Sequence, residues 1–298
     1  MKRKATLLPD LGERLRTYRI ASNLSVDDVA RRLGVSRAAV YRYEQGEVVK
    51  IETLQRLGKL LNVPLVALLG IEIEFVSDGY IFFERIRQIE SRAQSTVIVF
   101  GPIAYMLTSD EYDTFLRKAL DETYGDNATG VKRQLDGLMQ SLKSRKASFW
   151  KRRLNIVSIS SVPEIERFLG TGLVARTTVS DATSRERRAH ALREVRHIAE
   201  LLRRPPMGVQ IGLLTTGLPV SGFQIIREQD RMRVVNSPFR VVDIPNVQFG
   251  VASINDMGHV VQMHEQVANE LWSAALKGAV AAEKIEELAD QAARELAI

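Results

Sequence analysis

The chain has 298 residues, of which 45% are apolar and 26% are charged, and it contains no cysteine. This length suits two domains or one large domain, and the composition is sufficient for a packed core. The absence of cysteine excludes disulfides, thiolate metal ligands and cysteine nucleophiles. The longest nearly apolar run, residues 63–71, is less than half of a bilayer span, and no apolar signal segment follows the basic start at residues 1–4. We therefore expect a cytoplasmic protein without a membrane segment.

Positive charge is concentrated near the N-terminus. Residues 1–70 contain 13 Lys and Arg against 7 Asp and Glu, so their net charge of +6 equals that of the whole chain. This distribution is expected of a small module that meets a polyanion, because neutralised phosphates release counterions. The remaining segments carry −6 (residues 71–130), +10 (131–204) and −4 (205–298), so a second basic band lies in the middle of the chain.

Residues 11–69 show short helical patterns separated by stop signals. Ser25 precedes a segment with two acidic residues in its first turn, and Gly34 follows at the position where a left-handed residue ends a helix. Ser36 then caps a further helix that ends near Gly46. Two helices joined by about three residues that include a glycine are typical of a helix-turn-helix.

Residues 9–70 resemble the helix-turn-helix domain of the Cro and phage-repressor type, the XRE family. The caps, the core positions, the turn glycine and the ending Tyr43-Glu44-Gln45-Gly46 are all in register with it. The resemblance covers about a fifth of the chain and implies a sequence-specific DNA-binding transcriptional regulator. It also implies a structural ion pair between Arg19 and Glu44, which join the first helix to the end of the third.

In that family the third helix enters the major groove of DNA. Here Arg37 and Arg42 are candidates for guanine, and Ala38 or Ala39 for a thymine methyl, while one arginine contacting only the backbone is the alternative. The family usually has a glutamine where this chain has Val26, so other groups must make the phosphate contacts. The basic arm at residues 1–4 is one candidate. The alternative is that this arm is only a solvated terminus and makes no contact with DNA. The predicted DNA-binding residues are Ser25, Ser36, Arg37, Ala38, Ala39, Tyr41, Arg42 and Lys50.

The rest of the chain predicts a second, larger domain. Apolar β-branched runs at residues 96–100 and 154–159 are each followed by a helical pattern, which indicates α/β units and a partly parallel sheet. Further strands are expected at residues 209–214, 222–227, 232–235 and 247–254, and helices at 80–93, 262–276 and 279–296. The predicted fold class is therefore an all-α domain at residues 1–70, a linker at 71–79, and an α/β or α+β domain at 80–298.

In the spacing of its units this domain resembles the phospholipase D-like fold, but no histidine stands two residues before a lysine, as the enzymes of that family require. We predict no catalytic residues, no metal and no cofactor. His190, Glu194 and His197 have a spacing that suits a metal, yet neighbouring arginines favour a solvated basic helix. If the sheet is parallel, an effector pocket is expected at the carboxyl ends of its strands. The candidate pocket residues are Gly101, Ser160, Ser161, Thr215 and Thr216.

The basic band at residues 131–204 has two interpretations. Its cations flank Phe149 and Trp150, and basic residues interleaved with aromatics can stack on nucleic acid. The arginines at 185, 187, 188 and 193 could do the same or line a pocket for an anionic effector. The alternative places them in flexible surface loops, partnered with the acidic segments on either side.

The sequence favours a regulator, not an enzyme, that binds double-stranded DNA. The resemblance implies a homodimer on a pseudo-palindromic operator, and the larger domain predicts a response to a small-molecule effector. Two alternatives stay open at this point. One is an enzyme that carries a DNA-binding module, and the other is a protein whose second domain binds a protein partner.

Overall fold

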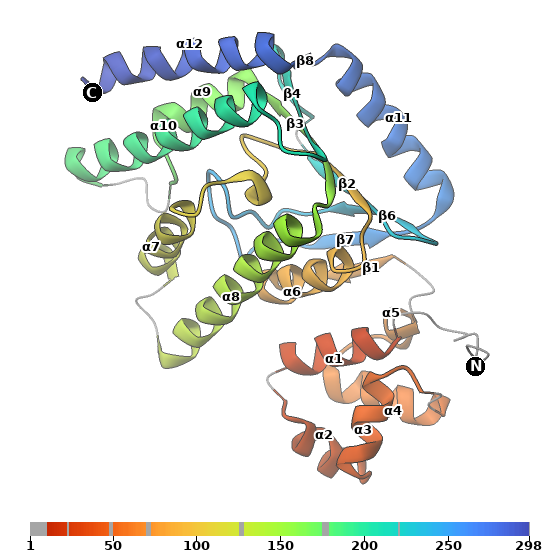
Figure 1. The fold of residues 1–298 in the computed structure, drawn as a ribbon. Helices are drawn as coiled ribbons and strands as arrows, with labels where there is room; N and C mark the ends of the chain where they lie inside the picture. Colours follow the sequence, from red (N-terminus) through yellow and green to blue (C-terminus); the bar gives the residue numbers. More distant parts are fainter. Residues whose placement is uncertain are drawn as a thin grey trace.

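The computed structural model describes residues 11–22, 24–47, 50–69, 73–124, 128–174, 179–219 and 221–297. The basic arm at residues 1–4 and the first residues of the predicted linker, 71–72, lie outside these ranges. Figure 1 shows a small helical domain at the start of the chain beside a larger domain built on one sheet. This architecture confirms the predicted fold class, an all-α domain followed by an α/β domain.

The N-terminal domain packs its helices around a small core of its own. Val29, Leu33, Val40 and Leu54 are at most 3% exposed and form its centre. The left-handed residue Asn62 ends the fourth helix. The helices are α1 (Leu11–Ala21), α2 (Val26–Leu33), α3 (Arg37–Glu44), α4 (Ile51–Leu61) and α5 (Leu65–Leu69).

In the described chain the larger domain contains a mixed eight-stranded sheet in the order β1-β7-β6-β5-β2-β3-β4-β8. The strands β2, β3 and β4 run parallel to one another, and every other neighbouring pair is antiparallel. The central strands are buried on both faces, which is why they read as continuous apolar runs. The strands are β1 (Glu74–Val76), β2 (Ser95–Val99), β3 (Asn155–Ser161), β4 (Val209–Leu214), β5 (Phe223–Arg227), β6 (Met232–Asn236), β7 (Ala252–Asn255) and β8 (Leu276–Lys277).

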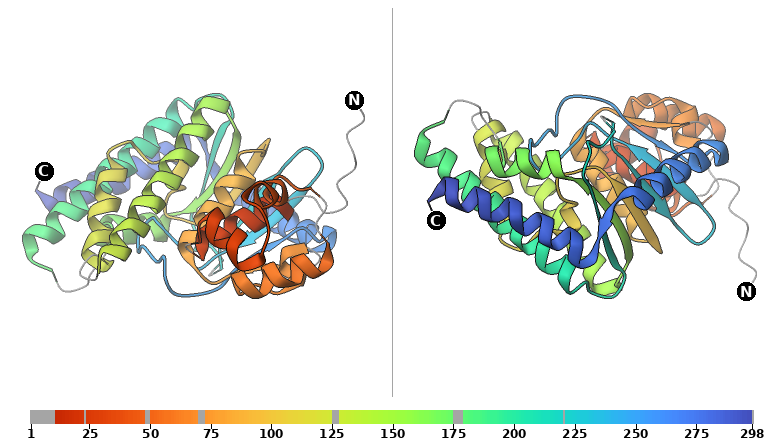
Figure 2. Two further views of the ribbon diagram at one scale, coloured as in Figure 1. Left: turned by 90° about the horizontal axis from the view of Figure 1, so that it is seen from below. Right: turned by 90° about the horizontal axis from the view of Figure 1, so that it is seen from above.

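Helices cover the two faces of this sheet unequally. On one face α6, α7, α8, α9, α10 and α12 share the main core with the sheet, whereas α11 packs alone on the opposite face (Figures 1 and 2). None of the described helices is long and apolar enough to span a bilayer. Their bounds are α6 (Gly79–Glu90), α7 (Tyr112–Tyr124), α8 (Ala128–Arg152), α9 (Val162–Thr171), α10 (Asp181–Arg203), α11 (Gly258–Ala274) and α12 (Gly278–Leu296), with a short 3₁₀ turn at Tyr105–Leu107.

The strand expected at residues 247–254 is wrong in its first half, because only Ala252–Asn255 is a strand. The carbonyl of Val247 accepts a hydrogen bond from the amide of Gly79 at 3.2 Å, so this backbone serves the start of α6 and not the sheet. A Cβ at Gly79 would lie 2.4 Å from that carbonyl oxygen, which explains the glycine. Part of the predicted linker is also a strand, since β1 pairs with β7.

The basic band lies on the long helices α8 and α10, so the prediction of surface loops is wrong, while the helix expected around His190 and His197 is confirmed. Its cations pair with the acidic segments on either side, as in the pairs of Lys146 with Asp113 (3.1 Å) and Arg188 with Glu295 (2.9 Å). Phe149 is only 4% exposed, so its ring does not face solvent for base stacking, whereas Trp150 is 38% exposed. The cations of the basic band therefore form ion pairs that link neighbouring helices. Figure 2 shows α10 and α12, which several of these pairs connect, running side by side.

Candidate nucleic-acid interface and effector cavity

Local hydrogen bonds fix the start of α2 and the turn between α2 and α3. The Ser25 hydroxyl accepts from the Asp28 amide at 3.1 Å, and the Asp28 carboxylate accepts from the Ser25 amide at 3.1 Å, which closes a capping box. Hydrogen bonds from Ser25 hold the pKa of the Asp28 carboxyl below its usual value. Gly34 ends α2 with φ of 68°, in the left-handed region that favours glycine, and the Ser36 hydroxyl accepts from the Ala39 amide at 3.1 Å.

One side of α3 is exposed and basic. The side chains of Arg37 and Arg42 are 63% and 58% exposed, and Tyr41 is 48% exposed. Ala38 is exposed as well, whereas Ala39 is only 6% exposed and belongs to the buried side of the helix. The predicted methyl contact with thymine therefore falls to Ala38.

Both arginines of α3 are held by carboxylates of their own domain. Arg37 Nε lies 2.8 Å from Asp27 Oδ1, and Arg42 Nε lies 3.5 Å from Glu47 Oε2. Exposed ion pairs of this kind contribute about 1 kcal/mol or less, so a phosphate or a base can replace them at little cost. The packing of α2 beside α3 brings Asp27 near Arg37, whereas Glu47 follows the end of α3, five residues after Arg42.

The first and third helices are braced against each other. Arg19 Nε lies 2.5 Å from Glu44 Oε1, and Arg19 Nη2 donates to Glu44 Oε2 at 3.1 Å, with the two side chains 13% and 8% exposed. The third nitrogen of the guanidinium donates to the Leu24 carbonyl at 3.0 Å. At the same crossing a Cβ on Gly12 would lie 2.5 Å from both the Glu44 carbonyl oxygen and the Gly46 amide nitrogen. The orientation of α3 thus depends on close contact with α1.

Two further predicted contacts lie at helix starts. Ser25 is exposed, but its hydroxyl already donates to the Asp28 carboxylate at 2.6 Å, so its use for a phosphate would require that bond to break. Lys50 is exposed at the N-cap of α4, where its side chain makes no capping bond. Lys50 therefore offers a mobile charge on a flexible stem, which suits a phosphate contact.

A buried junction joins the helix-turn-helix region to the larger domain. The Thr17 hydroxyl lies 2.8 Å from the Gln88 side-chain oxygen, and these residues are 2% and 9% exposed. Glu13 forms ion pairs with Arg92 and, at 3.8 Å, with Arg85. All of these contacts connect α1 with α6 or the turn that follows it.

Buried charge and a buried hydroxyl complete this junction. Arg85 is 1% exposed and makes a bidentate pair with Glu74 of β1, at 2.9 Å from Nε and 3.1 Å from Nη2. Beside it, burial and the charge of Glu74 raise the pKa of Tyr18 far above its usual value, so this hydroxyl stays neutral. The two domains are thus in contact through buried polar groups, with the partly exposed Glu13–Arg92 pair beside them.

The effector residues expected at the strand ends do not form one pocket. Ser160 donates to the Pro102 carbonyl, Ser161 is fully buried with its hydroxyl 3.4 Å from Glu164, and Thr215 and Thr216 are exposed. A Cβ at Gly101 would lie 2.2 Å from a Glu164 carboxylate oxygen, so this edge is closely packed. Of the five, only Gly101 lines the cavity described next.

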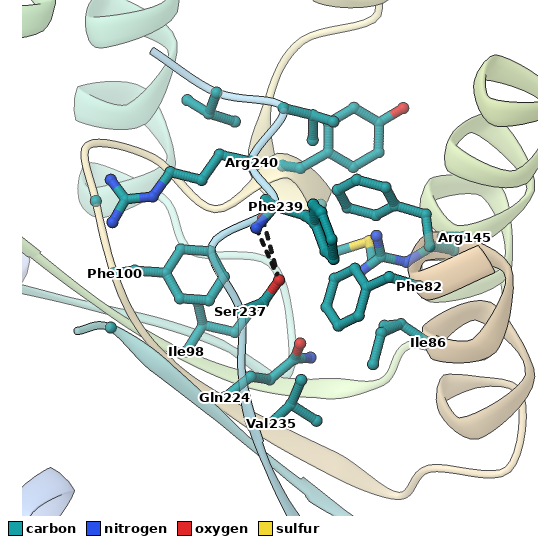
Figure 3. A pocket seen from close by; sticks show the side chains of 17 residues that line it. Phe82, Ile86, Ile98, Phe100, Arg145, Gln224, Val235, Ser237, Phe239 and Arg240 are labelled. Atoms are coloured by element: carbon teal, nitrogen blue, oxygen red, sulfur yellow. Dashed lines mark hydrogen bonds between the residues drawn. The ribbon is translucent and has the colours of Figure 1, made fainter. Parts of the chain in front are cut away.

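That cavity has a volume of about 70 Å³ and lies between α6, the antiparallel strands β5 and β6, and the chain that follows β6 (Figure 3). Its walls are mostly aromatic and aliphatic, with three polar side chains, Arg145, Gln224 and Ser237, and with Arg240 at one side. The main apolar contributors are Phe82, Phe83, Ile86, Phe100, Val235 and Phe239. A concave apolar surface with a few polar groups is typical of a small-molecule site.

The candidate metal ligands of α10 do not converge. Glu194 is 3% exposed and accepts hydrogen bonds from the amide and hydroxyl of Ser109, whereas His190 lies 3.9 Å from Glu186. Burial and the charge of Arg193 lower the pKa of His190 to about 4. Within the described ranges no group of three or more potential ligands gathers at one point.

Comparisons with known proteins match short stretches of the chain. Residues 10–69 match the family model of a helix-turn-helix domain. A protein of Methanocella arvoryzae named "Putative HTH-type transcriptional regulatory protein" is 41% identical over 54 residues, which are 18% of this chain and 17% of the relative. A protein of Pyrococcus furiosus with the same description is 46% identical over 56 residues, 18% of each chain. The match thus spans less than a fifth of these relatives. No solved structure matches the chain.

Proposed function

We propose that this protein is a sequence-specific DNA-binding transcriptional regulator of the XRE type, in which α3 reads the major groove and the larger domain binds an effector without transforming it. The observation that carries this proposal is the exposed basic side of α3, held rigidly by the Arg19–Glu44 pair and by caps at Ser25 and Ser36. The matched helix-turn-helix model over residues 10–69 supports it.

A single helix-turn-helix reads only a half-site, so the proposal includes a homodimer on a pseudo-palindromic operator. The proposed location of this dimer is the cytoplasm. Selection of bound sequences from random duplexes tests this directly. Two inverted half-sites, with two chains bound per duplex in sedimentation experiments, are the expected result. A selected site without inverted symmetry, bound by one chain, would exclude the dimer while leaving DNA binding intact.

Arg37→Ala tests direct reading of a base. We expect affinity for the selected duplex to fall by about 1–3 kcal/mol, together with a loss of preference at one base position, because a bidentate contact to guanine is removed. Binding titrations on the selected duplex and on single-position variants measure both effects. Arg31→Ala is the matched control, since this arginine is 75% exposed on α2 and paired with Asp28. Equal losses on selected and random duplexes would show that Arg37 contacts only the backbone.

Lys50→Ala tests a phosphate contact at the start of α4. We expect a similar loss of affinity for every duplex, because a phosphate carries no sequence information. The slope of log affinity against log salt concentration is expected to become shallower by about one unit, as one fewer counterion is released. An unchanged slope, or a loss restricted to the selected sequence, would contradict this assignment.

A further inference from the structure

Helix α6 separates the cavity from the helix-turn-helix. Phe82 and Ile86 point into the cavity (Figure 3), whereas Arg85 and Gln88 contact α1. At 100° per residue these two pairs lie on different sides of the helix. A change in the cavity that displaces α6 therefore acts directly on the buried contact between Gln88 and Thr17.

The orientation of one amide defines what the cavity can recognise. Gln224 is 4% exposed, and its Nε2 donates to Glu90 Oε1 at 2.9 Å and to the Thr96 hydroxyl at 3.0 Å. The Thr96 hydroxyl gives its own proton to the Ile225 carbonyl at 3.1 Å, and the Glu90 carboxylate can only accept. The nitrogen of the amide must therefore face these two groups.

The carbonyl oxygen of Gln224 consequently faces the cavity, as Figure 3 shows. Among the described residues it has no hydrogen-bond donor. This oxygen is not fully buried, so its unused capacity to accept is open to the cavity. It would be satisfied by an O–H or N–H group of a molecule that enters the cavity.

The groups that line the cavity favour a hydrogen-bond donor over an anion. Arg145 makes a bidentate pair with Glu90 at 2.8 and 2.9 Å. The guanidinium of Arg240 lies at the side of the cavity and points away from Gln224 (Figure 3). A carboxylate only accepts hydrogen bonds and cannot bond to Gln224 Oε1, so the cavity favours an uncharged molecule that donates.

The volume limits the size of the ligand. A water molecule needs about 10–15 Å³ of such space, so a cavity of about 70 Å³ has room for roughly five to seven atoms of that size. This corresponds to one ring with a small substituent. The aromatic walls formed by Phe82, Phe100 and Phe239 favour a flat ring.

We infer that the cavity binds an uncharged molecule of one aromatic ring with a hydroxyl or N–H donor, which bonds to Gln224 Oε1, and that occupancy acts through α6 on the position of α1. Binding of the ligand in the cavity does not depend on the proposed function, whereas control of DNA binding by the ligand rests on it. The ligand is thus the effector, and the Thr17–Gln88 hydrogen bond is the point at which its binding reaches the helix-turn-helix.

Calorimetry on the full-length protein with phenol, toluene and benzoate tests the ligand class. We expect phenol to bind and benzoate not to bind. Gln224→Met should weaken phenol about fivefold to tenfold with little effect on toluene, because only phenol donates to the lost acceptor. Gln210→Met, the same change at an exposed position of β4, should leave the ratio of the two affinities unchanged. No binding of phenol at millimolar concentration, or an unchanged phenol-to-toluene ratio in Gln224→Met, would overturn the site.

Two measurements test whether ligand binding in the cavity acts on α1. Saturating phenol is expected to change affinity for the selected duplex about fivefold or more. It should also change amide hydrogen exchange in residues 11–22, a measurement that needs no DNA. Thr17→Val should keep phenol binding but reduce both effects. Phenol binding without a change in hydrogen exchange would overturn the transmission. A change in exchange in a protein that binds no DNA would instead refute the proposed function alone.

Discussion

Glu44→Ala is expected to destabilise the helix-turn-helix region by about 3–5 kcal/mol, because it leaves the Arg19 guanidinium, whose side chain is only 13% exposed, without its carboxylate. The Leu24 carbonyl would remain as a partner for one nitrogen and cannot neutralise the charge. Since this pair ties the end of α3 to α1, affinity for the selected duplex should fall as well. Amide hydrogen exchange in α1 and α3 of the full-length chain measures the change in local opening free energy.

Glu47→Ala is the matched control for this experiment. Glu47 pairs with Arg42 at 3.5 Å, but both side chains are more than half exposed, so the loss should be below about 1 kcal/mol. Similar effects of the two substitutions would show that the Arg19–Glu44 pair is as weak as a surface pair.

Arg85→Ala is expected to cost a similar amount, about 3–5 kcal/mol, at the junction of the two domains. Arg85 is 1% exposed and Glu74, its bidentate partner, is 8% exposed, so the substitution leaves a buried carboxylate unpaired. It also removes the contact of Arg85 with Glu13 on α1. We expect lower resistance of the larger domain to urea, together with faster hydrogen exchange in α1 and β1.

Arg87→Ala on the same helix is the corresponding control. Arg87 is 35% exposed and pairs with Glu84 one turn away, and its loss should cost about 1 kcal/mol or less. If Arg85→Ala also cost less than about 1 kcal/mol, the buried pair would not stabilise the junction.

The helix-turn-helix region could be predicted almost completely from local signals. The caps at Ser25 and Ser36 and the left-handed Gly34 act over a few residues, so the local sequence is sufficient to place α2 and α3. The local sequence also predicts that the arginines of α3 are exposed. It does not predict that Ala38 is exposed and Ala39 buried, because that difference depends on how α3 packs against its neighbours.

Helix α8 has a periodic apolar pattern that charge alone does not reveal. Leu135, Leu138, Leu142 and Phe149 are at most 4% exposed and recur at helical spacing, so they form a core-facing stripe within the basic band. This periodicity could have identified the helix. The partners of its cations could not be identified in the same way, because Glu90 and Asp113 come from other elements.

Hydrophobic period, caps and turn residues are local properties, and they were sufficient to predict a helix-turn-helix module followed by an α/β domain. The place where a ligand could lie depends instead on contacts between distant segments. The apolar walls from α6 and the amide of Gln224 on β5 are far apart in the chain, and strand order in the sheet brings them together. Close packing also filled the strand ends at Ser160 and Ser161, where sequence reasoning had expected a pocket.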